Sequence, residues 1–288
     1  MDEYLSTGSE LTRRELIKQA VMATTLTAGF AMAVQPVGAM TIHTDSAGLV
    51  AEAVQIPTQD GVIPGYVARP DRDGTFPIML VVQEIFGVHE HIKDVCRRFA
   101  KRGYVAVAPE LFARQGDVSK LTDFQQILSI VAKVPDAQVM SDLDSAVTWA
   151  EHAGKGDRSR LGITGFCWGG RIAWLYAAHS KELKAGVAWY GRISGQTDPL
   201  HPKYPIDIAG ELNAPVLGLY GAQDQSIPVA TVERMKADAL SAGKQVDVVI
   251  YPDSGHAFHA DYRPSYNAKD AADGESRMYA WFEKYGVI

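Results

Sequence analysis

Short apolar runs alternate with longer amphipathic stretches along most of the chain after residue 50. The runs are typical of strands buried on both faces of a sheet, and they occur at 77–83, 104–109, 160–166, 185–191, 215–221 and 246–252. The longer stretches have helical spacing and occupy 89–103, 118–154 with a break near Pro135, 169–180, 229–244 and 269–286. Ahead of them, LVAEAVQIP and GVIPGYVARP predict a hairpin with its turn at QDG.

Strands that alternate with helices predict a mostly parallel central sheet with helices on both faces, which is the α/β class. The Pro-rich stretch 193–212 predicts a long surface loop, and no change in composition marks a second domain. We therefore expect one α/β domain over residues 40–288. Its composition, 47% hydrophobic and 22% charged, is ordinary for a globular protein.

The charge balance argues against nucleic acid as a partner. The formal net charge is −6, and the body of the chain contains no run of lysines and arginines. A protein that binds the phosphate backbone needs such a basic surface.

Residues 1–39 predict an export signal. A charged region with Arg13 and Arg14 precedes the apolar stretch 20–34 and the small-residue sequence PVGA. The paired arginines resemble the twin-arginine signal, so we expect cleavage after Ala39 and a periplasmic or secreted protein. The alternative is a membrane anchor, but the apolar stretch is shorter than the roughly 20 residues that a spanning helix needs. No second long apolar run follows, so we expect no stable membrane insertion after the signal is removed.

Chemically capable residues follow four of the predicted strands. Glu84 follows the run at 77–83, Cys167 the run at 160–166, Asp224 the run at 215–221 and His256 the run at 246–252. Ligands of such sheets bind at the carboxyl ends of the strands. The order nucleophile, acid, histidine is that of the α/β-hydrolase fold, whose GxSxG turn reads GFCWG here.

This turn suits a cysteine nucleophile. Gly165 and Gly169 leave space for strand and helix to approach, and the helix amino terminus favours a thiolate and an oxyanion. We expect the backbone N–H groups of Trp168 and Ile85 to bind the oxyanion. His256 is then the general base, and Asp224 orients it.

Each of these residues also has a structural interpretation. Cys167 could be a packing residue between glycines, Asp224 could cap a turn, and His256 could be an ordinary loop histidine. His259 and His201 compete for the role of base. The chain has only two cysteines, so at most one disulfide is possible. The other cysteine, Cys96, fits a buried helix face, where a free cysteine packs as a small apolar residue.

Six motifs together resemble the dienelactone hydrolase family: QEIFG (83–87), PELFARQ (109–115), GFCWGG (165–170), WYG (189–191), GAQD (221–224) and GHAF (255–258). The resemblance covers nearly all of 50–288. It implies a Cys-His-Asp hydrolase with Cys167, His256 and Asp224. It also implies a substrate pocket, to which we assign Phe86, Arg114, Tyr190, Phe258 and Arg263.

The resemblance also implies that Glu84 holds the cysteine as a resting thiol and then helps to generate the thiolate. Elementary electrostatics agrees in part, because a carboxylate beside a thiol opposes its ionisation unless the carboxylate moves or accepts the proton. The alternative is that Glu84 forms a structural ion pair with Arg114.

The chain departs from the family at the substrate-binding positions. The arginine expected four residues after the catalytic histidine is Ala260, and residues 116–134 contain no arginine. Arg263 is a candidate replacement. Trp168 stands where a leucine is more usual and would reshape the acyl site.

The sequence thus predicts an exported hydrolase, a monomer or homodimer, that cleaves a small ester or lactone through a thioester on Cys167. We expect no metal and no organic cofactor, because ligand clusters and phosphate-binding glycine loops are absent from the sequence. The alternatives are a noncatalytic or redox-responsive thiol protein on the same fold, and acyl transfer to an acceptor other than water.

Overall fold

A computed structural model describes residues 41–288. The predicted signal at 1–39 lies outside the described residues, so its cleavage and the export route stay predictions. Within residues 41–288, no helix is long and apolar enough to cross a bilayer.

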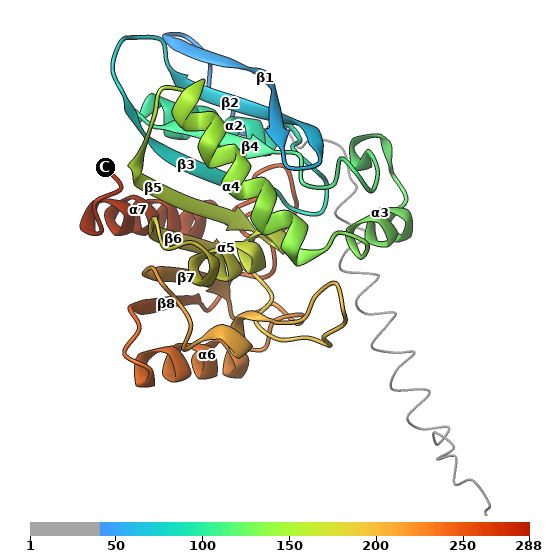
Figure 1. Ribbon diagram of the computed structural model, residues 1–288. Helices are drawn as coiled ribbons and strands as arrows, with labels where there is room; N and C mark the ends of the chain where they lie inside the picture. Colours follow the sequence, from blue (N-terminus) through green and yellow to red (C-terminus); the bar gives the residue numbers. More distant parts are fainter. Residues whose placement is uncertain (1–40) are drawn as a thin grey trace, which may run out of the picture. The chain divides into compact units, whose positions relative to one another are not determined.

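A single eight-stranded sheet runs through this part of the chain, in the order β1-β2-β4-β3-β5-β6-β7-β8 (Figure 1). Its strands are β1 (Leu49–Thr58), β2 (Gly61–Pro70), β3 (Phe76–Val82), β4 (Val105–Pro109), β5 (Gly156–Phe166), β6 (Leu183–Trp189), β7 (Val216–Gly221) and β8 (Val246–Tyr251). The hairpin β1–β2 and the pair β2–β4 are antiparallel, and β3 to β8 are parallel to their neighbours. The predicted mostly parallel α/β fold is therefore confirmed.

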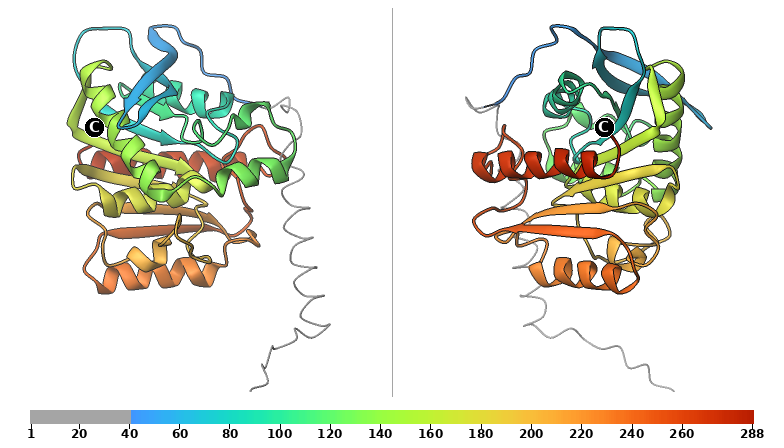
Figure 2. Two further views of the ribbon diagram at one scale, coloured as in Figure 1. Left: turned by 45° about the vertical axis from the view of Figure 1, so that its right-hand side comes forward. Right: turned by 90° about the vertical axis from the view of Figure 1, so that its left-hand side faces the viewer.

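The helices are α2 (Glu90–Lys101), α3 (Phe124–Val131), α4 (Asp136–His152), α5 (Trp168–His179), α6 (Val229–Ser241) and α7 (Ala268–Lys284), with 3-10 turns at Val118–Lys120 and Pro205–Ile208. Phe99 of α2 contacts the rings of Tyr279 and Phe282 of α7, so these two helices share one face of the sheet. Tyr176 of α5 donates to Asp144 of α4, and α4 and α5 cover the opposite face. In the right-hand view of Figure 2 the red α7 and the green α4 lie on opposite sides of the sheet.

The burial pattern explains why these segments form these elements. All seven residues of β3 are buried, as the continuous apolar run predicts for a central parallel strand. Helix α2 buries one face that includes Cys96, which is fully enclosed. Both cysteines are free. The prediction that Cys96 is a core residue is confirmed, and the disulfide alternative is wrong.

Several boundaries differ from the sequence-based expectation, and two of them have a clear structural setting. The predicted strand 185–191 ends at Trp189, because Gly191 passes so close to α5 that a Cβ there would lie 2.3 Å from the carbonyl carbon of Gly170. The predicted helical stretch from 118 begins its first α-helix only at Phe124, where the Asp123 side chain accepts from the N–H of Gln126. Pro135 then separates α3 from α4, as expected.

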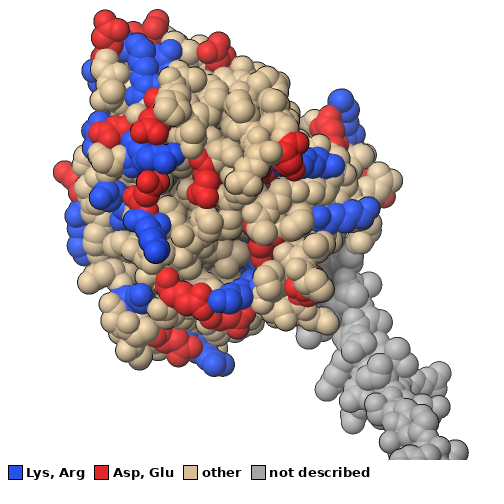
Figure 3. Space-filling view, viewed as in Figure 1, with Lys and Arg blue, Asp and Glu red and all other residues tan. Residues whose placement is uncertain are grey.

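Acidic and basic side chains are interspersed on the face drawn in Figure 3. Neither sign forms a continuous stripe on that face. This distribution agrees with the absence of a basic run in the sequence.

Candidate active site

Cys167 lies in a strained turn between the last residue of β5 and the first residue of α5. Its backbone angles are φ 56° and ψ −112°, in the positive-φ region that residues with a side chain rarely adopt. A Cβ on Gly165 would lie 2.1 Å from the carbonyl oxygen of Gly169, and a Cβ on Gly169 would lie 2.4 Å from that of Val82. The two glycines are therefore needed for the close approach that the sequence predicted.

The turn leaves specific backbone donors for a substrate. The N–H of Cys167 is already bonded to the carbonyl of Trp189 at 3.0 Å. Trp168 is the first residue of α5, so its N–H has no acceptor within the helix. Its indole packs edge-on against Phe112 at 4.7 Å between ring centroids. Ile85 follows Glu84 in the loop after β3 and is 6% exposed.

His256 and Asp224 meet at the carboxyl ends of β8 and β7. His256 Nδ1 lies 2.6 Å from Asp224 Oδ2, and Ser226 donates its N–H and hydroxyl to the other Asp224 oxygen. Burial lowers the pKa of His256, but the charge of a Cys167 thiolate and the hydrogen bond to Asp224 outweigh burial and raise that pKa to about 10. Burial raises the pKa of Asp224, and the hydrogen bond from His256 brings it below its usual value. These contacts therefore favour the protonated form of His256.

The two competing histidines are engaged elsewhere. His259 Nε2 bonds to Glu275 at 2.8 Å, and its ring packs between Phe166 and Trp189. His201 pairs with Asp198 in the Pro-rich loop. Of the three candidate bases, the structure brings His256 to Asp224 and Cys167.

Backbone strain is concentrated around this site. Four non-glycine residues in the described part of the chain have positive φ, and three of them are Cys167, Tyr190 (φ 39°) and Ala257 (φ 61°). Such conformations cost free energy and gather at functional sites. Tyr190 lies edge-on to His256 at 5.2 Å between ring centroids.

Tyr190 and Phe258 are buried aromatic residues next to His256. Both are fully buried, and their rings pack against each other at 5.5 Å. The hydroxyl of Tyr190 interacts with the charges of Glu84, Arg263 and Cys167, and burial followed by the charge of Glu84 raises the pKa of Tyr190. Neither side chain is exposed in this structure, and their assignment to a substrate pocket stays a prediction.

Glu84 is completely buried and is surrounded by donors. The hydroxyl of Tyr262 donates to its Oε2, His89 Nε2 lies 3.4 Å from the same oxygen, and Arg263 Nη2 lies 3.7 Å from Oε1. Burial raises the pKa of Glu84, but the Arg263 charge and the contact with His89 lower it to well below its usual value. Glu84 is thus held as a carboxylate.

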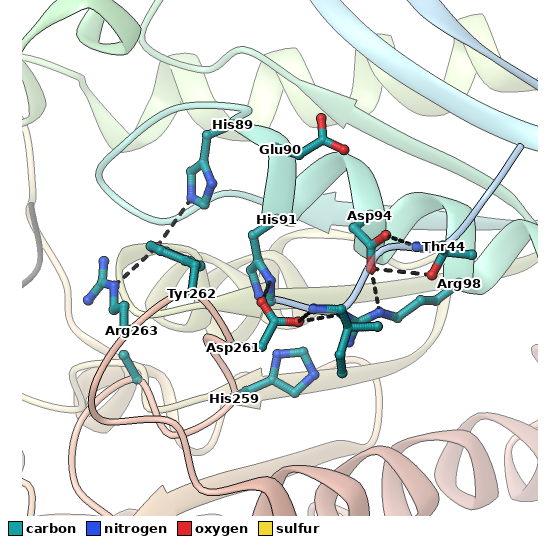
Figure 4. Close-up of polar contacts among 12 residues, drawn as sticks. Thr44, His89, Glu90, His91, Asp94, Arg98, His259, Asp261, Tyr262 and Arg263 are labelled. Carbon is teal, nitrogen blue, oxygen red and sulfur yellow. Dashed lines mark hydrogen bonds and ion pairs between the residues drawn. The ribbon is translucent and has the colours of Figure 1, made fainter. Parts of the chain in front are cut away.

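Arg263 reaches the interior of the site. Its guanidinium lies over the ring of Phe86 at 4.7 Å, its Nε donates to Tyr262 at 3.1 Å, and its residue is 9% exposed. The charges of Glu84 and Cys167 both act on it and help to raise its pKa against the effect of burial. Figure 4 shows Arg263, Tyr262 and His89 converging from two separate segments.

Arg114 does not take part in this arrangement. Its guanidinium binds Asp142 of α4 at 2.7 Å and also Asp60 in the β1–β2 turn. The suggested Glu84–Arg114 pair is therefore wrong, whereas the placement of Arg114 in a substrate pocket stays a prediction. The carboxylate of Glu84 pairs with Arg263 instead.

Sequence analysis missed three residues of the site. Tyr262 and His89 contact Glu84, and Glu110 holds the loop after β3 by accepting from Gln83 at 3.0 Å and from the N–H of Val88 at 2.8 Å. Glu110 lies in the quoted motif PELFARQ, which offered a signal for it. Tyr262 directly precedes Arg263, but nothing in the spacing indicates that its hydroxyl turns toward Glu84.

The sheet order, the strained cysteine turn, and an acid and a histidine after β7 and β8 place the protein among the α/β-hydrolases. Comparison with known proteins narrows this class. The sequence profile of the dienelactone hydrolase family matches residues 63–286, and the chain belongs to that family. It is therefore an enzyme that hydrolyses carboxylic esters or lactones of small molecules.

Individual relatives agree with this membership. The "Putative carboxymethylenebutenolidase" of Methylorubrum extorquens is 65% identical over 274 residues, which are 94% of each chain. The protein of the same name from Escherichia coli is 54% identical over 267 residues, 92% of this chain and 98% of that relative. The crystal structure of a "Putative Dienelactone Hydrolase" from Klebsiella pneumoniae has 55% identity and a TM-score of 0.80, and covers 82% of this chain and 99% of that chain.

Proposed function

We propose that this hydrolase cleaves its ester or lactone through a thioester on Cys167, with His256 as general base and Asp224 as the residue that orients it. The observation that carries the proposal is the conjunction at one sheet edge of the strained turn at Cys167 and the 2.6 Å contact between His256 and Asp224. A packing cysteine would need neither.

In the proposed first step, the Cys167 thiolate attacks the carbonyl carbon, and the carbonyl oxygen becomes an oxyanion. The N–H groups of Trp168 and Ile85 bind that oxyanion. The tetrahedral intermediate collapses, the bond to the alkoxy oxygen breaks, and the His256 imidazolium gives its proton to this oxygen. The products are a thioester on Cys167 and an alcohol, which stays attached to the acyl group if the substrate is a lactone.

In the second step, neutral His256 takes a proton from water, and the resulting hydroxide attacks the thioester carbon. The carbon–sulfur bond breaks, which releases the acid and restores the thiolate beside the imidazolium. Asp224 stabilises that imidazolium in both steps and fixes its ring orientation.

Arg263 has two proposed roles. Its positive charge offsets that of Glu84, so that the buried carboxylate opposes the Cys167 thiolate less. It is also a buried guanidinium available for a substrate carboxylate, at a site where Ala260 provides none. The relatives' name, carboxymethylenebutenolidase, describes a lactone of this kind, and we propose an unsaturated lactone bearing a carboxylate as the substrate class.

The test of the hydrolytic proposal is turnover of short p-nitrophenyl esters by the wild type and by Cys167→Ala, with Cys96→Ala as the matched control. We expect loss of turnover in Cys167→Ala only. Equal low rates in all three proteins would refute the thioester mechanism and favour a noncatalytic or redox-responsive thiol protein. Product analysis with added alcohols separates hydrolysis from acyl transfer.

The test of the role of Arg263 is a comparison of ester pairs that differ only in a carboxylate. We expect Arg263→Gln to raise KM for the charged ester by about tenfold or more, the size of a lost charge-assisted hydrogen bond. KM for the neutral ester should change little. Equal changes for both esters would refute recognition of a carboxylate.

We also propose that the protein is exported by the twin-arginine route and acts outside the cytoplasm. The support is the sequence of residues 1–39, with its paired arginines, apolar stretch and small-residue cleavage pattern.

A further inference from the structure

The first described residues of the chain are bonded to a cluster of buried charges beside the active site. The N–H of Ile42 donates to Asp261 Oδ2 at 3.2 Å, and the N–H and hydroxyl of Thr44 donate to the carboxylate of Asp94. In return, Arg97 Nε donates to the carbonyl of Thr44 at 2.7 Å. Figure 4 shows Thr44 against Asp94 at one end of this cluster and Asp261 at its centre. We call residues 41–44 the N-terminal strap.

The charges of the cluster explain why it needs the strap. The guanidiniums of Arg97 and Arg98 bind four carboxylates, which belong to Glu90, Asp94, Asp261 and Glu275. Further donors complete the buried carboxylates: the ring of His259 on Glu275 at 2.8 Å, the ring of His91 on Asp261 at 3.1 Å and the N–H groups of the strap. A buried carboxylate that loses one of its donors is less well compensated for its desolvation.

Asp261 connects the cluster to the reacting groups. It is 3% exposed and immediately precedes Tyr262 and Arg263, the residues that hold Glu84. Successive turns, with Ala260 N bonded to Ala257 O and Arg263 N to Ala260 O, make a short rigid path from His256 to Arg263. The position of Asp261 therefore sets the positions of the side chains on either side of it.

The ring of His91 provides a second connection. Its Nδ1 is hydrogen-bonded to Asp261, and the centroid of the ring lies 5.3 Å from that of the Tyr262 ring. A shift of Asp261 would move His91 and Tyr262 together. Neither contact depends on residues that bind the substrate in the proposed mechanism.

We propose that the N-terminal strap is a positioning element of the active site: by holding Asp261 it aligns Tyr262 and Arg263 with Glu84 and Cys167. The strap touches no reacting atom. Without it, Asp261 keeps its bonds to Arg98 and His91 but loses one donor to Oδ2, and the side chain and the turn that carries Arg263 shift to compensate. This inference rests on the proposed function in one respect only: it takes Cys167 to be the nucleophile.

The experiment compares Ile42→Pro with Ile42→Ala in the full chain. Proline removes the N–H that donates to Asp261, whereas alanine keeps it and removes only a side chain that is 44% exposed. The readout is alkylation of Cys167 by iodoacetate, an anion, relative to iodoacetamide, its neutral analogue. Cys96 is fully buried, and Cys167→Ser measures any background. Arg263→Gln shows how far the ratio falls when the cation is lost.

We expect the iodoacetate to iodoacetamide ratio to fall in Ile42→Pro by about fivefold or more, in the range of coupling between linked sites, and to stay near the wild-type value in Ile42→Ala. The fall should approach that of Arg263→Gln. Asp261→Asn, which keeps the shape of the side chain and removes its charge, should lower the ratio as well, and it serves if Ile42→Pro does not fold.

Two results would overturn the proposal. One is an unchanged ratio in folded Ile42→Pro and folded Asp261→Asn, which would make the strap a purely structural contact. The other is an unchanged ratio in Arg263→Gln, which would mean that Cys167 does not respond to Arg263. Alkylation needs no ester turnover, so the experiment distinguishes failure of the proposed strap function from failure of the hydrolytic mechanism.

Discussion

Replacement of Asp224 by asparagine tests the electrostatic basis of the proposed mechanism. Residue Asp224 is 5% exposed, and its carboxylate lies 2.6 Å from His256 Nδ1. Asparagine has almost the same shape, but its single amide oxygen can accept either from the ring or from Ser226, and its NH2 group then faces the other donor. The substitution therefore removes a charge and leaves the packing in place.

The magnitude follows from the geometry. With charge centres about 4 Å apart and an effective dielectric constant of about 20, loss of the Asp224 charge costs the imidazolium about 4 kcal/mol. Each pKa unit corresponds to about 1.4 kcal/mol. We therefore expect the pKa of His256 to fall from about 10 to about 7. His256 would then be only about half protonated at neutral pH.

Two assays measure this change. The pH dependence of Cys167 alkylation by iodoacetamide reports the thiolate, and ester turnover reports catalysis. We expect kcat/KM to fall by about 10³-fold or more, since loss of the orienting carboxylate in such triads costs up to about 10⁴-fold. If Asp224→Asn keeps both the alkylation profile and the turnover of the wild type within about twofold, Asp224 does not orient the base and the proposed mechanism is wrong.

Three further predictions concern stability and export. Gly169→Ala should lower the free energy of unfolding in urea by about 2 kcal/mol or more, because its Cβ would lie 2.4 Å from a backbone oxygen of β3; an unchanged midpoint would contradict the close approach. Burial raises the pKa of Glu275, but the hydrogen bond from His259 and other contacts lower it to about 2. The contribution of Glu275 to stability is therefore present above about pH 4.5 and is lost as the pH falls toward 2. Glu275→Gln should flatten the pH dependence of the melting temperature in that range. Replacing Arg13 and Arg14 by lysine should leave the protein in the cytoplasm, and amino-terminal sequencing of the exported wild type should begin at Met40.

The order of strands and helices could be predicted from the chain because its signals are local. Continuous apolar runs, helical spacing and the break at Pro135 placed the elements of the sheet, and the glycines of GFCWG located the strained turn. Glycine spacing carries this information because a turn without room for Cβ atoms has few other solutions.

The surroundings of Glu84 could not be predicted in the same way. The turn that carries Tyr262 and Arg263 is shaped by Asp261, which is held by α2 and by a segment 219 positions earlier in the chain. The Glu84–Arg114 pair was wrong for the converse reason, since the partners of Arg114 lie in the β1–β2 turn and in α4. Ion pairs between such distant segments leave no periodic pattern in a sequence.

The two free cysteines give the enzyme a simple response to oxidants. Cys96 is fully enclosed, whereas Cys167 is partly exposed, so a peroxide finds a single accessible thiol. A sulfenic acid formed at Cys167 has no accessible second cysteine with which to close an internal disulfide, because the chain has only two cysteines. With Cys167 as the proposed nucleophile, recovery of activity would depend on a thiol supplied from outside the protein, and continued exposure to the oxidant would lead to the irreversible sulfinic acid. The fold of residues 41–288 contains no disulfide, so it has no disulfide for a reductant to break.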